Sequence, residues 1–156
     1  MCLIVTARLS GSDAARAVEI RSVAGLPSER RLFHFSRRRS DTINIPGPDG
    51  GCGCSFLAES ADWNAPTWDM EPATLPRLEQ ILRTIHAQTS GEFSFDALWV
   101  GETPLEEQRV AFEHLLELVR ESRLGTSTRY TVTRDSDAKA YRCRQPLAAL
   151  VPPFTL

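Results

Sequence analysis

Two cysteines separated by a single glycine are the most chemically distinctive feature of the sequence. Cys52 and Cys54 flank Gly53, and Gly50 and Gly51 come just before them. Thiolates held two residues apart can bind a soft metal ion or be oxidised, and the backbone amides of nearby glycines can lower the pKa of a thiol. On a regular strand both sulfurs would lie on the same face. The pair is therefore a candidate site for thiol or metal chemistry.

A metal site built on this pair would need further ligands, because a structural zinc site takes four. The residues that could supply them are Cys2, Cys143 and His34. We take Cys52, Cys54 and His34 as the candidate metal ligands. The structural alternative is that cysteine acts here as a small, buried hydrophobic residue beside glycine. Four cysteines are too few for a disulfide scaffold in a chain of 156 residues, so reduced thiols are expected.

The first two residues offer a second nucleophile. Removal of Met1 would give Cys2 a free α-amine that could act as its base. This Met-Cys start resembles the opening of the N-terminal-nucleophile amidohydrolases, and the resemblance covers these two residues. It implies Cys2 as the nucleophile of an amide hydrolysis. A retained Met1 would block that amine.

An aperiodic stretch at residues 61–70 concentrates aromatic and acidic side chains. It contains Trp63 and Trp68 together with Asp62 and Asp69. The indole rings could form an apolar wall for a small molecule or a protein segment, with the aspartates as polar contacts. Alternatively, the rings close the open end of the core and fasten a long loop. These four residues are candidate ligand-binding residues.

Three consecutive arginines, Arg37, Arg38 and Arg39, form another candidate binding site. Guanidinium groups bind phosphate or carboxylate through planar, bidentate hydrogen bonds, although a solvated turn is the alternative. The chain carries 18 basic and 20 acidic residues, a formal net charge of −2. It lacks the overall positive charge typical of nucleic-acid-binding domains, so nucleic acid is not an expected partner.

The hydrophobic pattern predicts the elements that position these residues. Six segments have the apolar or alternating pattern of strands: residues 2–7, 32–36, 42–45, 54–57, 93–100 and 130–133. Proline and glycine at 46–51 predict a hairpin between the third and fourth of them.

Helical spacing predicts three helices. The first covers residues 14–21, with Ser10, Ser12 and Asp13 as N-cap candidates and Ala14, Ala17, Val18 and Arg21 as its recurring positions. Pro72 and Pro76 bracket the start of the second, whose apolar stripe ends at Gly91. The third starts at the capping box of residues 103–106 and ends at Gly125.

This order of elements predicts an α+β fold. We expect a two-layer sandwich with a mixed or antiparallel sheet of about five strands and helices mainly on one face, ferredoxin-like with an added α-β unit. Residues 1–134 form the single domain. Residues 135–156 form an ordered C-terminal tail that packs on the domain or on a neighbouring subunit.

The sequence favours a small cytoplasmic binding or assembly module without catalysis of its own. No apolar run reaches the roughly 18 residues of a membrane span, and residues 1–5 lack the features of a signal peptide, so no membrane partner is expected. Common nucleotide and hydrolase motifs are missing, so no cofactor is expected. Self-association through a sheet face or the tail is expected. The alternative is a ligand-binding or enzymatic protein, with a pocket at the Trp63 to Trp68 loop and a thiol or metal site at Cys52 and Cys54.

Overall fold

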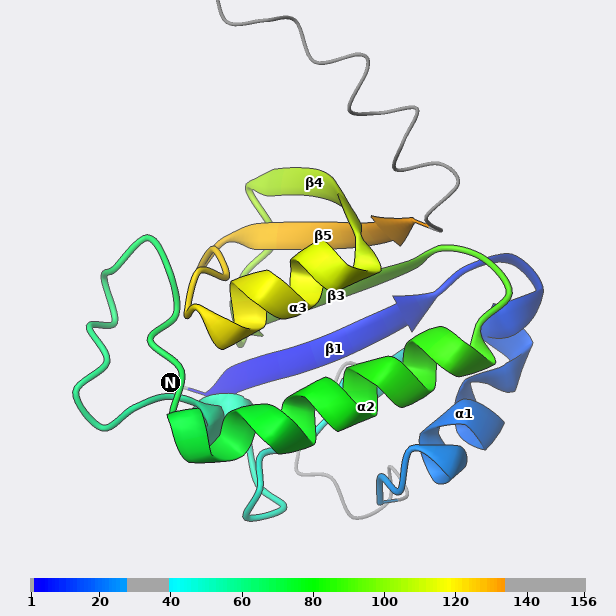
Figure 1. The fold of residues 1–156 in the computed structure, drawn as a ribbon, viewed down its shortest axis with the longest axis horizontal. Coiled ribbons are helices and arrows are strands. Elements are labelled where there is room, and N and C mark those ends of the chain that lie inside the picture. The colour runs from blue at the N-terminus through cyan, green and yellow to red at the C-terminus, as the bar shows by residue number, and fades with distance from the viewer. Residues whose placement is uncertain (1, 28–39, 134–156) are drawn as a thin grey trace, which may run out of the picture.

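Five strands form one mixed sheet in the computed structural model, which describes residues 2–27 and 40–133 (Figure 1). The strands are β1 (Leu3–Leu9), β2 (Thr42–Ile45), β3 (Phe93–Trp99), β4 (Glu106–Ala111) and β5 (Thr128–Thr133). Their spatial order is β2-β1-β3-β5-β4. Only β4 and β5 are parallel, and the other neighbouring strands are antiparallel.

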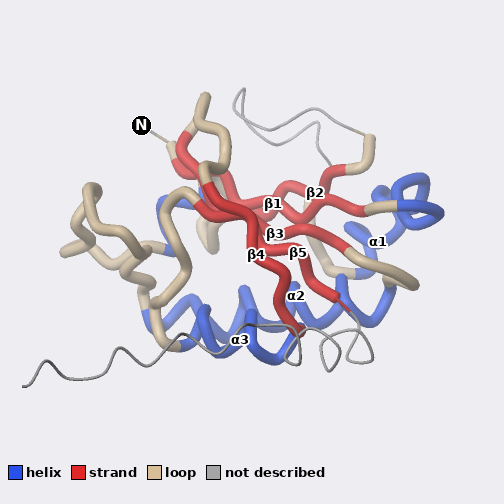
Figure 2. The backbone as a smooth tube through the Cα atoms, turned by 90° about the horizontal axis from the view of Figure 1, so that it is seen from above, coloured by secondary structure: helices blue, strands red, loops and turns tan. Residues whose placement is uncertain are grey.

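The α-helices of the described residues form a layer on one side of this sheet. They are α1 (Ala17–Val23), α2 (Leu75–Gln88) and α3 (Phe112–Arg120). Figure 2 shows α2 and α3 along the same face of the sheet. Short 3₁₀ helices also occur: η1 (Gly11–Arg16), η3 (Gly53–Phe56) and η4 (Pro72–Thr74). The α+β class and the single sheet of about five strands are confirmed, and the sheet is mixed, one of the two expected types. A ferredoxin-like fold with an added unit stays a prediction.

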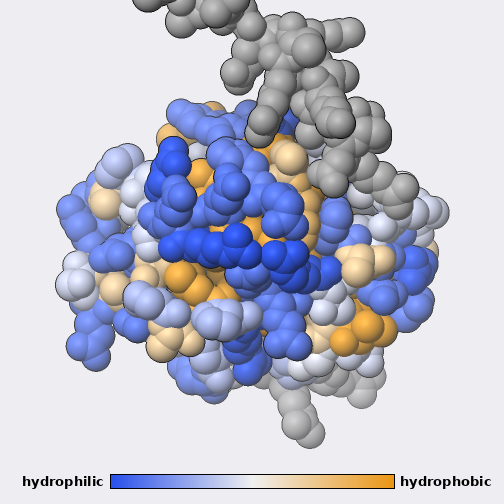
Figure 3. Space-filling view, viewed as in Figure 1, coloured by the Kyte–Doolittle hydropathy of each residue, from blue (hydrophilic) through white to orange (hydrophobic). Residues whose placement is uncertain are grey.

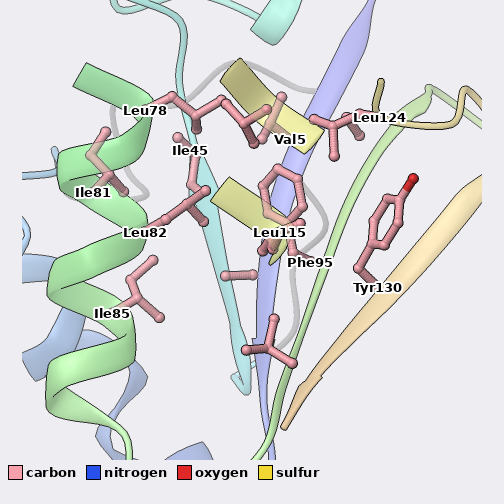
Figure 4. Packing of buried hydrophobic residues seen from close by; sticks show 14 of the residues in the cluster. Val5, Ile45, Leu78, Ile81, Leu82, Ile85, Phe95, Leu115, Leu124 and Tyr130 are labelled. Carbon is pink, nitrogen blue, oxygen red and sulfur yellow. The ribbon is translucent and has the colours of Figure 1, made fainter. Parts of the chain in front are cut away.

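The core lies between the sheet and the helices. Side chains alternate along a strand, so one face of β1 and β3 points to the helix layer. Residues three and four apart on α2 point from that layer to the sheet. Figure 4 shows these side chains meeting. The buried set includes Leu3, Val5, Ala7, Phe93, Phe95, Leu78, Ile81, Leu82, Ile85, Leu115 and Leu116.

The predicted strand at residues 54–57 is wrong. Most of this segment belongs to η3, and β2 pairs with β1 instead of with a hairpin partner. Gly53 explains the difference: a Cβ there would lie 2.7 Å from Cγ2 of Val5 and 3.1 Å from the carbonyl oxygen of Leu3. The absence of a side chain lets a tight turn rest directly on the start of β1.

The third helix begins later than the capping box predicts. The box ends at Glu106, the first residue of β4, and α3 starts at Phe112. The amides of Leu105 and Glu106 both donate to the carbonyl of Ser127, at 2.8 and 3.2 Å, and all six residues of β4 pair with β5. Pairing with β5 satisfies the backbone groups that a local cap would otherwise use, so tertiary context overrides the capping signal.

The first helix is present as η1 followed by α1, and its recurring positions differ in burial. Ala17 and Arg21 are buried, whereas Val18 is 66% exposed. Asp13, expected as an N-cap, is buried and accepts hydrogen bonds from the amide and hydroxyl of Ser90 and the amide of Gly91, at 2.8, 3.0 and 3.2 Å. It therefore joins η1 to the connection between α2 and β3.

Several predictions lie outside the described residues. They concern the strand at 32–36 with His34, the three arginines Arg37, Arg38 and Arg39, Cys143 and the tail 135–156. Within the described part of the chain, no helix has both the length and the apolar character needed to cross a membrane.

Candidate functional site

Three cysteine side chains converge at the start of β1. Cys54 lies in η3, and its sulfur accepts a hydrogen bond of 3.1 Å from the amide of Leu3. Cys52 precedes η3, and the neighbouring thiols of Cys54 and Cys2 act to lower its pKa. All three cysteines carry reduced thiols, and the residues are partly exposed. The fold therefore brings the Cys-Gly-Cys motif to the N-terminal cysteine.

The sheet edge explains why Cys54 sits at this position. The pairing of β1 with β2 covers residues Val5 to Arg8, so the amide of Leu3 lies beyond the end of β2. A buried amide needs an acceptor. The sulfur of Cys54 supplies one, because Gly53 allows η3 to approach the backbone of β1 closely.

The pKa values of Cys52 and Cys54 are shifted in opposite directions. Burial acts to raise the pKa of Cys52, but hydrogen bonds from the thiol and amide of Cys54 and from the thiol of Cys2 outweigh it, so the pKa lies below its ordinary 9.0. Burial and donation to Cys52 raise the pKa of Cys54 to about 11. Cys54 is thus a protonated donor at neutral pH, and Cys52 is the sulfur that it stabilises as a thiolate.

The loop before η3 is held closed by its acidic residue. The carboxylate of Asp49 accepts hydrogen bonds from the amide of Gly51 at 3.0 Å and the hydroxyl of Ser55 at 2.9 Å. These bonds lower the pKa of Asp49, so it is charged at neutral pH. The negative charge of Asp49 acts to raise the pKa of Cys52. A Cβ at Gly47 would lie 2.5 Å from the carbonyl oxygen of Cys52, so glycine is required for this closure.

The tryptophans of the 61–70 loop pack on the last residue of β3. Trp63 stacks on Trp99 with ring centroids 4.8 Å apart and planes 3° apart, and Trp68 meets Trp99 edge-to-face at 5.0 Å. Trp68 is 1% exposed and donates from Nε1 to the carbonyl of Ala97 at 3.0 Å. Trp63 is 52% exposed. Trp68 therefore closes the end of the core, whereas Trp63 presents an indole to solvent.

The thiols and the stacked tryptophans lie at the same end of the sheet. Leu3 pairs with Trp99 across β1 and β3, and its amide bonds Cys54 at the other edge of β1. Figure 1 shows the N-terminal end of β1 beside the loop that precedes α2.

A groove in the described part of the chain lies elsewhere, on the helix layer. It has a volume of about 460 Å³, and its lining includes Pro72, Leu75, Arg83 and Arg120. Figure 3 shows hydrophilic side chains across this face of the molecule. Both arginines pair with Glu79. The pocket predicted at the Trp63 to Trp68 loop stays a prediction.

The other candidate residues have separate positions. Asp62 is exposed and accepts a hydrogen bond of 2.9 Å from the amide of Asn64 within its own loop, and Asp69 is exposed. Among the residues that the structure describes, no group of three or more His, Cys, Asp or Glu side chains is arranged to hold a metal ion. His34, the third predicted ligand, lies outside them.

The sheet also holds a buried polar group that its sequence pattern does not reveal. The hydroxyl of Thr6 donates to Asp96 at 2.7 Å, and Arg129 donates to the same carboxylate at 2.9 Å. Thr6 and Asp96 are each under 4% exposed. The three residues are direct register partners on β1, β3 and β5. Polar residues at alternating strand positions were the available signal, but only the strand order shows that they meet.

In comparisons with known proteins, no family model, no curated protein and no solved structure matches the chain.

Proposed function

We propose that this chain carries out thiol–disulfide exchange, with Cys52 as the attacking sulfur. The observation that supports the proposal is the meeting of three cysteines at the start of β1. The sulfur of Cys54 lies 3.1 Å from the amide nitrogen of Leu3, the residue after Cys2, and the thiols of Cys54 and Cys2 both act to lower the pKa of Cys52. Donors aimed at a sulfur stabilise the negative charge that it carries as a nucleophile. All three cysteine residues are partly exposed, which favours the approach of a substrate disulfide.

The chemistry needs a disulfide as the second reactant. The Cys52 thiolate attacks one sulfur of the substrate disulfide, the substrate bond breaks, and one substrate thiolate leaves. A second protein thiol then attacks the mixed disulfide and displaces the other substrate thiol. The protein is oxidised by two electrons, and the substrate is reduced to two thiols. The reverse sequence transfers a disulfide from the protein to a dithiol.

Competitive alkylation tests the assignment of the nucleophile. The folded chain is treated with less than one equivalent of iodoacetamide at neutral pH, and the labelled cysteines are identified by peptide mass spectrometry. Cys52 should be labelled several-fold faster than the other cysteines, and this preference should disappear in denaturant. Equal labelling in the folded chain would contradict the proposal.

A second candidate function rests on Trp63. Its stacked and half-exposed indole resembles the aromatic anchors of binding surfaces. This favours the binding or assembly module expected from the sequence, in which a ferredoxin-like domain self-associates in the cytoplasm. Trp63→Ala should then lower the molecular mass measured by light scattering, whereas Trp63→Phe should preserve it. A wild-type chain that is monomeric at all concentrations would contradict self-association.

A further inference from the structure

We propose that Cys2 is the resolving thiol of this site and that Cys54 is a positioning residue. This assignment rests on the proposed thiol–disulfide exchange at Cys52. It concerns which sulfur attacks the mixed disulfide once Cys52 has reacted. The Cys-Gly-Cys motif alone would suggest Cys54 as the resolving thiol, because it is the nearest cysteine in sequence. The three-dimensional arrangement instead favours Cys2, which is distant in sequence.

Cys54 is held by contacts that an attack would break. Its sulfur is the acceptor for the amide of Leu3 at 3.1 Å. If Cys54 moved onto Cys52, this amide would lose that partner at the edge of the sheet. Burial is also the main cause that keeps the Cys54 thiol protonated, and it persists after Cys52 has reacted. A bond between residues 52 and 54 would close a very short ring, which strains a disulfide.

Cys2 has fewer constraints. It precedes β1, and its backbone is fixed by the hydrogen bond from the amide of Val100 to its carbonyl at 2.9 Å. The residue is partly exposed, it directly precedes Leu3, whose amide holds Cys54, and its thiol acts to lower the pKa of Cys52. Rotation about the side-chain bonds can therefore change this thiol from a hydrogen-bond donor into an attacking group without loss of the backbone contact.

In the second step, Cys2 resolves the mixed disulfide on Cys52. A Cys52–S–S–R mixed disulfide is attacked at the Cys52 sulfur by the Cys2 thiolate, whose proton passes to solvent. The S–S bond to R breaks, R–S⁻ leaves and takes up a proton, and a Cys2–Cys52 disulfide forms. This bond ties the start of β1 to the loop before η3. A ring of this length should raise the thermal midpoint of unfolding, whereas a bond within Cys-Gly-Cys should have a much smaller effect.

Trapping experiments distinguish the two resolving thiols. In a Cys143→Ser background, the chain is mixed with one equivalent of 4,4′-dithiodipyridine, which releases a coloured thiol at each step. The background protein and its Cys54→Ser variant should release two equivalents and form a Cys2–Cys52 disulfide. The Cys2→Ser variant should release one equivalent and retain the mixed disulfide on Cys52. Peptide mapping of the oxidised background protein gives the connectivity without any substitution at the site.

The outcomes separate the two proposals. A Cys52–Cys54 disulfide in the background protein, or a mixed disulfide trapped in Cys54→Ser, would overturn the role of Cys2 while leaving Cys52 as the nucleophile. Slow reaction of Cys52 in every variant would instead contradict the proposed function.

The positioning role of Cys54 has its own readout. Cys54→Ala should shift the pH midpoint of Cys52 alkylation upward, and Cys54→Ser, which keeps a donor, should restore part of the shift. An unchanged midpoint in Cys54→Ala would contradict this role.

Discussion

At the scale of single residues, the reactivity of Cys52 depends on a balance between burial and hydrogen bonding. Burial disfavours a thiolate, and donors from Cys54 and Cys2 favour it. Sequence reasoning identified Cys52 and Cys54 from their spacing beside glycine and named Cys2 as an additional ligand. It could not assign unequal roles, because the difference arises from the contact between Cys54 and Leu3, which needs the folded sheet edge.

Asp13 gives a prediction for acid stability. Burial acts to raise its pKa, but hydrogen bonds from Ser90 and Gly91 and the charge of Arg16 lower it below the ordinary value of 3.8. The stabilisation is therefore present above about pH 4 and is lost as the pH falls through the lower pKa of the folded state. Asp13→Ala should reduce the free energy of unfolding at pH 7 by about 2 kcal/mol, since three donors lose a charged acceptor.

Urea unfolding at pH 7 and at lower pH checks this prediction. The difference between wild type and Asp13→Ala should shrink as the carboxylate is protonated. A difference that is independent of pH would contradict the ionic role of Asp13. Asp69→Ala, which changes an exposed aspartate, is the matched control and should have little effect at either pH.

The two loop tryptophans should respond differently to substitution. Trp68 is buried and bonded to Ala97, so Trp68→Ala should reduce the free energy of unfolding by about 3–5 kcal/mol. Trp63 has one ring face in solvent, so Trp63→Ala should have a clearly smaller effect. In acrylamide quenching, Trp63→Phe should remove most of the accessible fluorescence. If most of the quenchable emission remained, the exposed position of Trp63 would be contradicted.

At the scale of elements, local signals competed with tertiary contacts. The periodicity of α2 predicts its helix correctly, because the same stripe that forms the helix is buried against the sheet. The capping box at residues 103–106 is equally clear, yet the chain forms β4 there, because β5 offers a full row of backbone partners. Such a partner, distant in sequence, leaves no trace in a local pattern.

Gly53 allows η3, which carries Cys54, to pack closely on β1. A methyl group at this position would push η3 away from Val5 and from the carbonyl of Leu3. Gly53→Ala should therefore reduce the free energy of unfolding by about 1–3 kcal/mol. It should also slow the alkylation of Cys52, because Cys54 would move with η3.

Gly91→Ala is the matched control for this substitution. No atom lies within 4 Å of a Cβ built at Gly91, so neither stability nor the rate of Cys52 alkylation should change appreciably. Urea unfolding and timed alkylation measure the two effects. Equal behaviour of the two variants would show that the close packing of η3 on β1 does not control the site.

At the scale of the whole molecule, the sequence predicts the layers better than the topology. Apolar alternation in strands and stripes on helices are sufficient for an α+β class with one sheet, as found. The order β2-β1-β3-β5-β4 depends on contacts between residues distant in sequence, which one sequence does not display. The convergence of Cys2 with Cys52 and Cys54 depends on the packing of η3 against the start of β1. The sequence therefore shows the Cys-Gly-Cys motif but not the meeting of the three cysteines.

The C-terminal tail carries a prediction for the assembled molecule. Its apolar residues Leu147, Leu150, Val151 and Phe154 favour packing on the domain or on another subunit. Deletion of residues 145–156 should therefore lower the melting temperature or reduce the mass measured by light scattering. If both quantities were unchanged, this packing would be refuted.

The titration of Cys52 tests the account most directly. Thiolate absorbance in the ultraviolet is recorded against pH for the folded chain and for Cys52→Ser, and the difference between the two curves isolates this residue. Because the donors stabilise the thiolate, we expect a midpoint below the ordinary pKa of 9.0 and an upward shift in the Cys54→Ala background. A midpoint at or above 9.0 in the intact chain would contradict the central claim that the surrounding thiols activate Cys52.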